Sequence, residues 1–399
     1  MEQCQAYEDD PYRRELEVTV LGAGEAAAGA PAAFFAEVDA TILFPGGGGQ
    51  PADHGRLGGQ PVVASEALNE GRTRLYLAAA IAGPGKKLLE LDWSLRYDLM
   101  QQHTAQHLLS AIAEDRFGWR TTSFHLSDEL TDIELDAAEL APAQLEELEA
   151  AVAAAIRAAL PVRARRVEQE EYQALPKVRS RGLPAGHQGK IRLVEIEGID
   201  LATCGGTHLR STAEIEMLKL LHQEPMRGGT RLYWVAGGRV RSRLAAAEAR
   251  NSRLRRLLDT GDQELVSVLE GKLEQLTELR KSKERLAAKL AEAEAGRLGE
   301  QPFAERHFED GDLPFLQKLA KSWQEGQAPG LLFLTAGKNQ EGAFLLATRG
   351  AASLDLKTIG GEVAPLLEGK GGGAGRLYQG KATSFERREE AVARLASLG

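Results

Sequence analysis

Two pairs of metal-ligating residue types, far apart in the sequence, constrain the fold of this chain more than any other feature. His103 and His107 lie four residues apart in a segment predicted to be helical, so their imidazoles share one helix face. Cys204 and His208 have the same spacing, and the two glycines between them let the backbone turn tightly. The histidine pair alone could be ordinary core histidines. When the Cys204–His208 pair is considered as well, one metal ion shared by all four side chains is favoured over ordinary core histidines. The fold must then bring the two segments that carry these pairs together.

The donor types indicate which metal the site would take. Imidazole nitrogen and thiolate sulfur favour zinc over magnesium or calcium, so we predict one Zn²⁺ per chain. Four protein ligands would close the site around a structural ion, whereas catalysis needs an open position. Two alternatives therefore remain: a closed structural site, or a catalytic site in which one ligand stays loose or the ion takes a fifth ligand. The four predicted ligands are His103, His107, Cys204 and His208.

Residue patterns in the first 238 positions predict two domains of an α+β protein. Residues 1–91 contain short segments of period two, such as Leu16 to Val20, separated by glycine and proline turns, which predicts a small β-barrel. Residues 92–238 mix helical and strand patterns, which predicts an α+β domain that contains the zinc site. Ser94 is expected to cap the first helix of this domain, and Gly118 to end it.

The remaining residues predict a long helical segment and a last compact domain. Residues 239–298 contain no proline, and their apolar residues recur in steps of three and four, as in a coiled coil. A single helix of this length would span roughly 90 Å, whereas Gly261 and Gly271 would allow a helical hairpin, and both alternatives remain open. Residues 299–399 predict an α/β domain that carries a glycine-rich motif around Gly371 to Gly373.

Composition excludes several classes of protein. The chain has 399 residues and a formal net charge of −9, which argues against a protein coated in nucleic acid. No apolar run approaches the roughly 18 residues of a membrane helix, and the acidic start lacks the apolar core of a signal peptide. Two cysteines cannot build a disulfide framework. A cytoplasmic location without a membrane partner is therefore expected.

A glycine-rich loop is the second candidate site. Gly46 to Gly49 are followed by Gln50 and Pro51, without the Lys-Ser/Thr ending of a phosphate-binding P-loop. On its own this loop would be a plain turn. The amide of Gln50 offers both donors and an acceptor, which suits it to orienting a water molecule or an ester carbonyl.

Taken together, these motifs resemble one family. Thr41-Ile-Leu-Phe-Pro, running into Gly-Gly-Gly-Gln50-Pro-Ala-Asp53-His-Gly55, resembles the signature of the editing domain of alanyl-tRNA synthetases. Arg96, the histidine pair and the Cys204–His208 pair follow in the order of that family, and the glycine-rich C-terminal motif resembles part of the last domain of the same synthetases. Nearly the whole chain is thus similar to free-standing, trans-acting alanyl-tRNA editing proteins of the long form.

The resemblance implies an activity, a partner and site residues. It implies hydrolysis of the ester that joins serine, or glycine, to tRNA(Ala), while alanyl-tRNA(Ala) is spared. Such a second site is needed because an apolar pocket rejects an added hydroxyl only weakly. The implied partner is tRNA(Ala), and the long helix or the last domain would be where a homodimer forms. The implied catalytic residues are Thr41, as the contact for the serine hydroxyl, and Gln50; the implied substrate or tRNA contacts are Arg96, Gln106 (often threonine in the synthetases), Gly371, Gly372 and Gly373.

Basic residues are concentrated in two segments. Residues 226–256 hold nine arginines and one glutamate, and residues 161–192 hold eight lysines or arginines and three glutamates. Exposed helices often carry charge on a solvated face, but so one-sided a distribution favours contact with phosphates. Arg179 and Arg181, in a loop with glycine and proline, are expected to approach the acceptor end of the tRNA.

Two other functions fit part of this pattern. The editing domains of threonyl-tRNA synthetases share the four-ligand set, but the Gly-Gly-Gln loop and the last domain favour the alanyl family. A non-catalytic, zinc-stabilised module for tRNA binding or dimerisation would explain the predicted metal ligands and the coiled-coil pattern of residues 239–298. It does not explain Thr41, Gln50 and the arginine-rich segment together.

Overall fold

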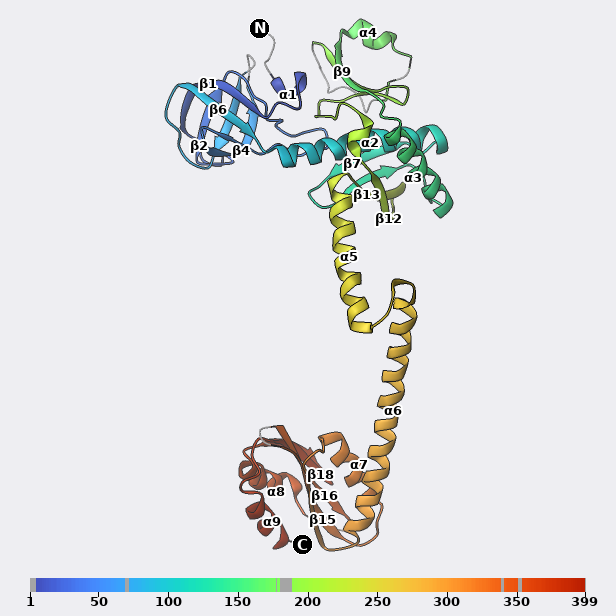
Figure 1. Cartoon of the computed structure of the whole chain (residues 1–399). Coiled ribbons are helices and arrows are strands. Elements are labelled where there is room, and N and C mark those ends of the chain that lie inside the picture. Colours follow the sequence, from blue (N-terminus) through green and yellow to red (C-terminus); the bar gives the residue numbers. More distant parts are fainter. Residues whose placement is uncertain are drawn as a thin grey trace. The chain divides into compact units, whose positions relative to one another are not determined.

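The computed structural model describes residues 5–68, 72–176, 178–179, 189–338, 341–350 and 354–398. The chain forms two compact units, Met1–Ser252 and Arg253–Gly399, and Figure 1 shows the elements within each of them. The predicted α+β class is confirmed, since each unit combines helices with one or more sheets. The predicted domain boundaries after residues 91, 238 and 298 stay predictions.

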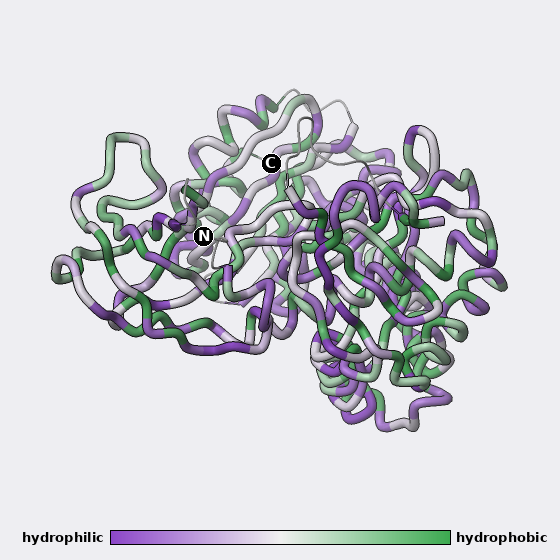
Figure 2. The backbone as a smooth tube through the Cα atoms, turned by 90° about the horizontal axis from the view of Figure 1, so that it is seen from above, coloured by the Kyte–Doolittle hydropathy of each residue, from purple (hydrophilic) through white to green (hydrophobic). Residues whose placement is uncertain are grey.

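The first unit contains the predicted small β-barrel. Its strands close in the order β1-β2-β5-β4-β3-β6, and every neighbouring pair is antiparallel. Alternate residues of the strands, such as Val18 and Val20, fill the interior of the barrel. Figure 2 shows how hydrophobic and hydrophilic stretches follow one another along the whole chain. The strands are β1 (Glu15–Glu25), β2 (Phe34–Val38), β3 (Gly55–Leu57), β4 (Gln60–Ala67), β5 (Thr73–Leu77) and β6 (Gly85–Leu91).

A long helix, α2 (Trp93–Phe117), leads from the barrel into the rest of the unit (Figure 1). The expected cap at Ser94 is wrong: the side chain of Asp92 accepts hydrogen bonds from the backbone N–H groups of Ser94 and Leu95. Gly118 ends the helix as expected, with a left-handed φ of 72°. Every residue from 99 to 109 is buried, so α2 is a central helix that supplies side chains to all of its surroundings.

Two sheets and a helix surround α2. A four-stranded sheet has the order β12-β13-β8-β7, a three-stranded sheet has the order β11-β10-β9, and helix α3 packs against α2 in one apolar core. The bounds are β7 (Thr121–Leu126), β8 (Thr131–Leu135), α3 (Pro142–Arg157), β9 (Val162–Val167), α4 (Gln169–Ala174), β10 (Ile191–Ile196), β11 (Asp200–Thr203), β12 (Leu218–Met226) and β13 (Gly229–Ala236); α1 (Ala6–Asp9) precedes the barrel.

The predicted long helical segment is two helices, α5 (Gly238–Leu258) and α6 (Leu265–Leu298). Asp259 adopts a left-handed φ of 52°, and a short 3₁₀ turn at Asp262–Glu264 follows, so one continuous helix is wrong. Gly271, by contrast, lies inside α6 without breaking it. Most of the leucines that recur in steps of three and four, as in a coiled coil, are exposed, including Leu269, Leu276, Leu279, Leu286 and Leu290.

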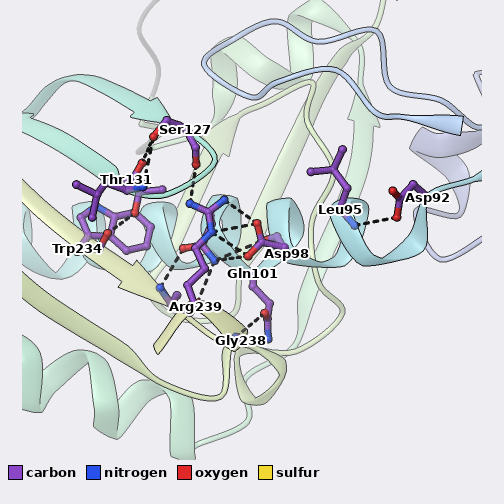
Figure 3. A network of polar contacts seen from close by, with 12 residues as sticks. Asp92, Leu95, Asp98, Gln101, Ser127, Thr131, Trp234, Gly238 and Arg239 are labelled. Atoms are coloured by element: carbon purple, nitrogen blue, oxygen red, sulfur yellow. Dashed lines mark hydrogen bonds and ion pairs between the residues drawn. The ribbon is translucent and has the colours of Figure 1, made fainter. Parts of the chain in front are cut away.

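A polar network fixes the start of α5 to α2 (Figure 3). Arg239 donates from Nη2 to Asp98 Oδ2 at 2.6 Å and from Nη1 to the carbonyl of Ser127 at 2.6 Å. The backbone N–H of Gly238 donates to Gln101 Oε1 at 3.1 Å. The first turn of α5 is therefore held by side chains of α2.

The second unit is a mixed sheet covered by helices on both faces. The order is β14-β15-β16-β18-β17, and only β14 and β15 pair in parallel among the described strands. Alternate residues of β15 enter two separate cores, with the end of α6 and α7 on one face and α8 and α9 on the other. The bounds are β14 (Phe303–Phe308), α7 (Leu313–Gln324), β15 (Gly330–Lys338), β16 (Glu341–Arg349), α8 (Leu356–Val363), β17 (Lys370–Ala374), β18 (Leu377–Ala382) and α9 (Arg388–Ala396).

None of the helices in the described ranges combines the length and the apolar character that crossing a bilayer requires.

Candidate metal centre

The four predicted metal ligands converge in the first unit. Helix α2 presents His103 and His107 one turn apart, and the segment that follows β11 carries Cys204 and His208. One ligand atom from each side chain lies within 4.8 Å of all the others. The three histidines are buried and the cysteine is partly buried. The fold thus brings the two ligand-bearing segments together, as a shared metal site requires.

The spacing of these atoms fits a tetrahedral ion. Cys204 Sγ lies 3.4 Å from His103 Nε2 and 3.2 Å from His208 Nε2. Metal–ligand bonds of about 2.0–2.3 Å in a tetrahedron separate neighbouring ligand atoms by about 3.5 Å. These two distances are compatible with a tetrahedral metal ion, and three imidazoles with one thiolate form a donor set that favours zinc.

Each histidine of the cluster is held by a second partner at Nδ1. His103 Nδ1 lies 2.7 Å from Gln50 Oε1, His107 Nδ1 lies 2.9 Å from Asp200 Oδ2, and His208 Nδ1 lies 3.3 Å from the hydroxyl of Thr104. These contacts leave Nε2 of each ring as the ligand atom. Outer partners of this kind fix the tautomer and the ring orientation of metal-ligating histidines.

The electrostatics of the cluster favour a thiolate. Burial opposes ionisation of Cys204, but the imidazoles of His103 and His208 lower the pKa of its thiol well below the usual value. Burial and the nearby His103 lower the pKa of His208 to about 3, so this ring is neutral and able to ligate. Burial alone would lower the pKa of His107, but Asp200 and Cys204 raise it to about 10. A metal bound there must displace a proton from His107.

Glycines let the two ligand segments approach the cluster. A Cβ at Gly206 would lie 2.4 Å from His103 Cε1 and 2.5 Å from Gln50 Oε1, whereas a Cβ at Gly205 would meet nothing within 4 Å. All four glycines of the loop at 46–49 have positive φ, between 59° and 127°, which favours glycine at each position. In addition, a Cβ at Gly49 would lie 2.4 Å from the ring of Phe124. The run of glycines is therefore a conformational requirement of the loop that delivers Gln50.

A cavity of about 790 Å³ opens onto the cluster. His103, His107 and Cys204 line it, so three of the four ligands are reachable from the cavity. Gln106 also lines it: its Nε2 donates to the hydroxyl of Ser110 at 2.9 Å, while its Oε1 is buried without a hydrogen-bond partner among the described residues. The prediction that Gln106 contacts substrate stays a prediction, and its place on the cavity wall supports it.

Thr41 and Gln50 lie behind the cavity wall, and neither is among the described residues that line it. The hydroxyl of Thr41 accepts a hydrogen bond from the backbone N–H of Leu43 at 3.0 Å, and the side chain is buried. Gln50 Oε1 accepts from the backbone N–H of Thr207 at 3.0 Å as well as contacting His103, and its Nε2 donates to the Thr207 hydroxyl at 2.9 Å. Gln50 thus joins the two halves of the cluster.

Arg96 is fully buried and forms an ion pair with Asp53. Its Nη1 donates to the carbonyl of Pro11 at 2.8 Å and its Nη2 to the carbonyl of Ile42 at 2.7 Å. Asp53 Oδ2 also accepts from the backbone N–H of Phe44 at 2.6 Å. This burial argues against the predicted contact of Arg96 with substrate or tRNA, because every contact it makes ties α2 to the barrel loops.

The remaining predicted contacts lie in different surroundings. Arg179 lines the cavity but is held by three carboxylates, those of Glu114, Asp115 and Asp200. Arg181 lies outside the described residues. Gly371, Gly372 and Gly373 belong to β17, an exposed strand at the edge of the sheet in the second unit. None of these contacts with tRNA is tested by the geometry, and they stay predictions.

Sequence reasoning missed the residues that hold the ligands from behind. Asp200 and Thr104 contact His107 and His208 directly, Thr207 holds Gln50 against His103, and Arg179 in turn donates to Asp200 Oδ1 at 3.1 Å. A local signal existed for two of them, since Thr104 follows His103 and Thr207 precedes His208. For Asp200, the only local signal in the sequence was its position four residues before Cys204.

Asp200→Asn is expected to weaken zinc binding by about 10- to 100-fold, as loss of an outer carboxylate partner typically does. The amide keeps the shape but loses the negative charge that makes the His107 ring a stronger base, and hence a stronger ligand, and that favours a bound cation. Zinc affinity would be measured by competition with a chromophoric chelator. Asp132→Asn is the matched control, because Asp132 forms a similar contact of 3.1 Å with the exposed His125. Equal zinc affinity in both variants would contradict the outer-partner role of Asp200.

Comparison with known proteins relates these features to a family. Residues 191–233 match the family described as threonyl and alanyl tRNA synthetase second additional domain. The chain is 37% identical over 361 residues to the alanyl-tRNA editing protein Aarsd1 of Danio rerio, covering 89% of this chain and 86% of that protein. It is 34% identical over 402 residues to Aarsd1 of Mus musculus, covering 97% and 96%. It is 27% identical over 395 residues to the alanyl-tRNA editing protein AlaX-L of Pyrococcus horikoshii, covering 94% and 93%.

Among solved structures, the C-Ala domain of Aquifex aeolicus alanyl-tRNA synthetase matches 24% of this chain and 88% of that domain, at 23% identity and a TM-score of 0.23. A score this low carries no weight for the fold. The near full-length similarity to the animal proteins is decisive instead. The chain belongs to the family of alanyl-tRNA editing proteins.

Proposed function

We propose that this protein is a zinc-dependent aminoacyl-tRNA deacylase that hydrolyses seryl-tRNA(Ala), or glycyl-tRNA(Ala), and spares alanyl-tRNA(Ala). The observation that supports it most is the position of the cluster: His103, His107 and Cys204 line a cavity of about 790 Å³. A purely structural zinc site needs no such opening. The three relatives described above are named alanyl-tRNA editing proteins, and these names supply the substrate class.

The residues of the cluster divide the work between ligation and positioning. Bound zinc would supply a positive charge that holds the substrate amine or polarises a water molecule or the ester. Gln50 and Asp200 fix the rings of His103 and His107 through Nδ1. The side-chain amide of Gln50 already forms hydrogen bonds with His103 and Thr207. We therefore assign Gln50 a positioning role and prefer it to the direct catalytic role that the resemblance suggested.

Amino-acid selection is assigned to the cavity wall. We keep Thr41 as a candidate contact for the serine hydroxyl, although its own hydroxyl already accepts a backbone hydrogen bond. Gln106 is the stronger candidate of the two, because it lines the cavity and its Oε1 has no hydrogen-bond partner among the described residues. A buried acceptor without a partner favours a ligand that supplies a donor.

Release of labelled serine from seryl-tRNA(Ala) tests the proposal. We expect serine to be released, alanine on the same tRNA to be retained, and release to stop after zinc is stripped and to resume when zinc is restored. The alternative is a zinc-stabilised module that binds tRNA without turnover. Retained zinc and tRNA without serine release would favour that module over a deacylase.

We propose that the tRNA contacts α5, because only some of its arginines form ion pairs with other described residues of the chain. Arg239 is paired with Asp98, and Arg241 with Glu216. Arg243 and Arg250 are exposed and form no ion pair within the described part of the chain. They lie seven residues apart, so their side chains share one face of the helix. Among the described residues, this face therefore presents two cations without an ion pair, about two helical turns apart.

Neutralising both residues, as Arg243→Gln with Arg250→Gln, is expected to weaken tRNA binding and to lower the slope of log affinity against log salt by about 2, one for each lost phosphate contact. Filter binding over a range of salt concentrations would measure it. The double variant Arg116→Gln with Arg163→Gln is the control. It removes the same net charge from residues that pair with Glu147 and Glu197. An equal change of slope in the control would show a non-local effect of charge and contradict the assignment to α5.

A further inference from the structure

The cavity has a polar group that the proposed chemistry does not use, the hydroxyl of Tyr7. Tyr7 lies in α1 and lines the same cavity as the cluster, with only 4% of its surface exposed. Its hydroxyl forms no hydrogen bond within the described residues, and it is not one of their fully buried polar atoms that lack a partner, so it is accessible from the cavity. The hydroxyl of a largely buried tyrosine usually has a partner, so a free hydroxyl on a cavity wall points to a ligand.

The surroundings of Tyr7 hold it in place. Its ring packs edge-on against Phe44, with ring centroids 5.6 Å apart and an interplanar angle of 80°. The backbone N–H of Ala6 donates to the carbonyl of Thr41 at 2.9 Å, which ties α1 to the glycine-rich loop segment. Burial, and then the carboxylate of Glu8, raise the pKa of Tyr7. The phenol therefore stays protonated and can donate.

The position of Tyr7 indicates which part of the substrate it meets. The wall formed by α2 and the Cys204 segment carries the ligands, where the aminoacyl group must lie for the proposed reaction. Tyr7 belongs to a different part of the wall, with Phe44, Pro45 and Gly46. The next group along the substrate from the ester is the ribose of the terminal nucleotide, which keeps one free hydroxyl beside the esterified one.

We propose that the Tyr7 hydroxyl forms a hydrogen bond with the free ribose hydroxyl of the terminal nucleotide of the aminoacyl-tRNA. The assignment rests on the proposed function for its substrate class. It makes Tyr7 a substrate-binding residue, and it gives the N-terminal segment, outside the motifs that suggested the family, a place in the site. Such a contact is present before and during the reaction, so it affects binding rather than the chemical step.

A double-mutant cycle with non-hydrolysable analogues tests the contact. The probes are the 3′-seryl amide of 3′-amino-3′-deoxyadenosine and its counterpart that also lacks the 2′-hydroxyl. We expect Tyr7→Phe to raise the dissociation constant of the first by about 3- to 10-fold, the range of one neutral hydrogen bond, and to leave that of the second within about twofold. Tyr12→Phe is the matched control: it removes the same atom from a hydroxyl that donates to Glu214 at 2.6 Å.

The outcomes separate this contact from the proposed reaction. Equal weakening of both analogues by Tyr7→Phe, or no weakening of either, would overturn the ribose contact even if the protein releases serine. A protein that shows the coupling but releases no serine would keep the contact and overturn the deacylase. A fall in kcat for seryl-tRNA(Ala) at unchanged KM would place Tyr7 at the ester instead, and would also overturn the proposal.

Discussion

Gly206→Ala is expected to abolish stable zinc binding and to lower serine release by at least about 100-fold, the effect of a misplacement of about 1 Å at a reacting centre. The added Cβ would lie 2.4 Å from His103 Cε1 and 2.5 Å from Gln50 Oε1. Neither group can move away easily. His103 is a predicted ligand on a buried helix, and Gln50 is held by the backbone and the hydroxyl of Thr207. The substitution therefore disturbs the inner ligand and its outer partner together.

Gly205→Ala provides a control one residue away. Its added Cβ would meet nothing within 4 Å, and its φ is not in the left-handed range, so zinc and activity should be retained. Zinc content after purification, measured by inductively coupled plasma mass spectrometry, and circular dichroism of both variants would separate loss of metal from loss of fold. A Gly206→Ala protein with full zinc content would show that the Cys204–His208 segment is loose, contrary to the contacts described here.

The sequence was sufficient to predict which side chains converge on the cluster, and the reason is physical. Helical periodicity alone places His103 and His107 on one face, and the glycines between Cys204 and His208 allow a tight turn. Ligand chemistry then requires the two segments to meet. The barrel was predictable for a similar reason, because a period of two in short segments separated by turns is a local signal.

What the sequence could not supply depends on tertiary placement. Asp200 and Thr104 are ordinary polar residues until the fold sets them against Nδ1 of a ligand, and no local pattern encodes that contact. The resemblance implied that Arg96 contacts substrate or tRNA, and no local pattern showed that its side chain would be buried against Asp53. The break between α5 and α6 depends on a left-handed Asp259, a conformation that aspartate adopts only in a suitable context.

Arg96→Met is expected to destabilise the first unit by about 3–5 kcal/mol, the typical effect of removing one partner of a buried ion pair. Both side chains of the Arg96–Asp53 pair are fully buried. Without the guanidinium, Asp53 keeps its hydrogen bond from Phe44 but loses its counter-charge, and the carbonyls of Pro11 and Ile42 lose a donor. Acceptors that are left buried without partners add to the penalty.

Differential scanning calorimetry would measure the effect of Arg96→Met, with the transition of the second unit as an internal reference. At about 2–4 °C per kcal/mol for a unit of this size, the midpoint temperature of the first transition should fall by roughly 6–20 °C.

Arg231→Met is the surface control: its ion pairs with Asp132 and Glu134 are partly exposed, and such pairs contribute about 0–1 kcal/mol. Adding Asp53→Leu to Arg96→Met should recover part of the loss, because a buried charge without a partner is then removed as well. Equal transitions for Arg96→Met and Arg231→Met would show that the buried pair adds nothing to the stability of the unit.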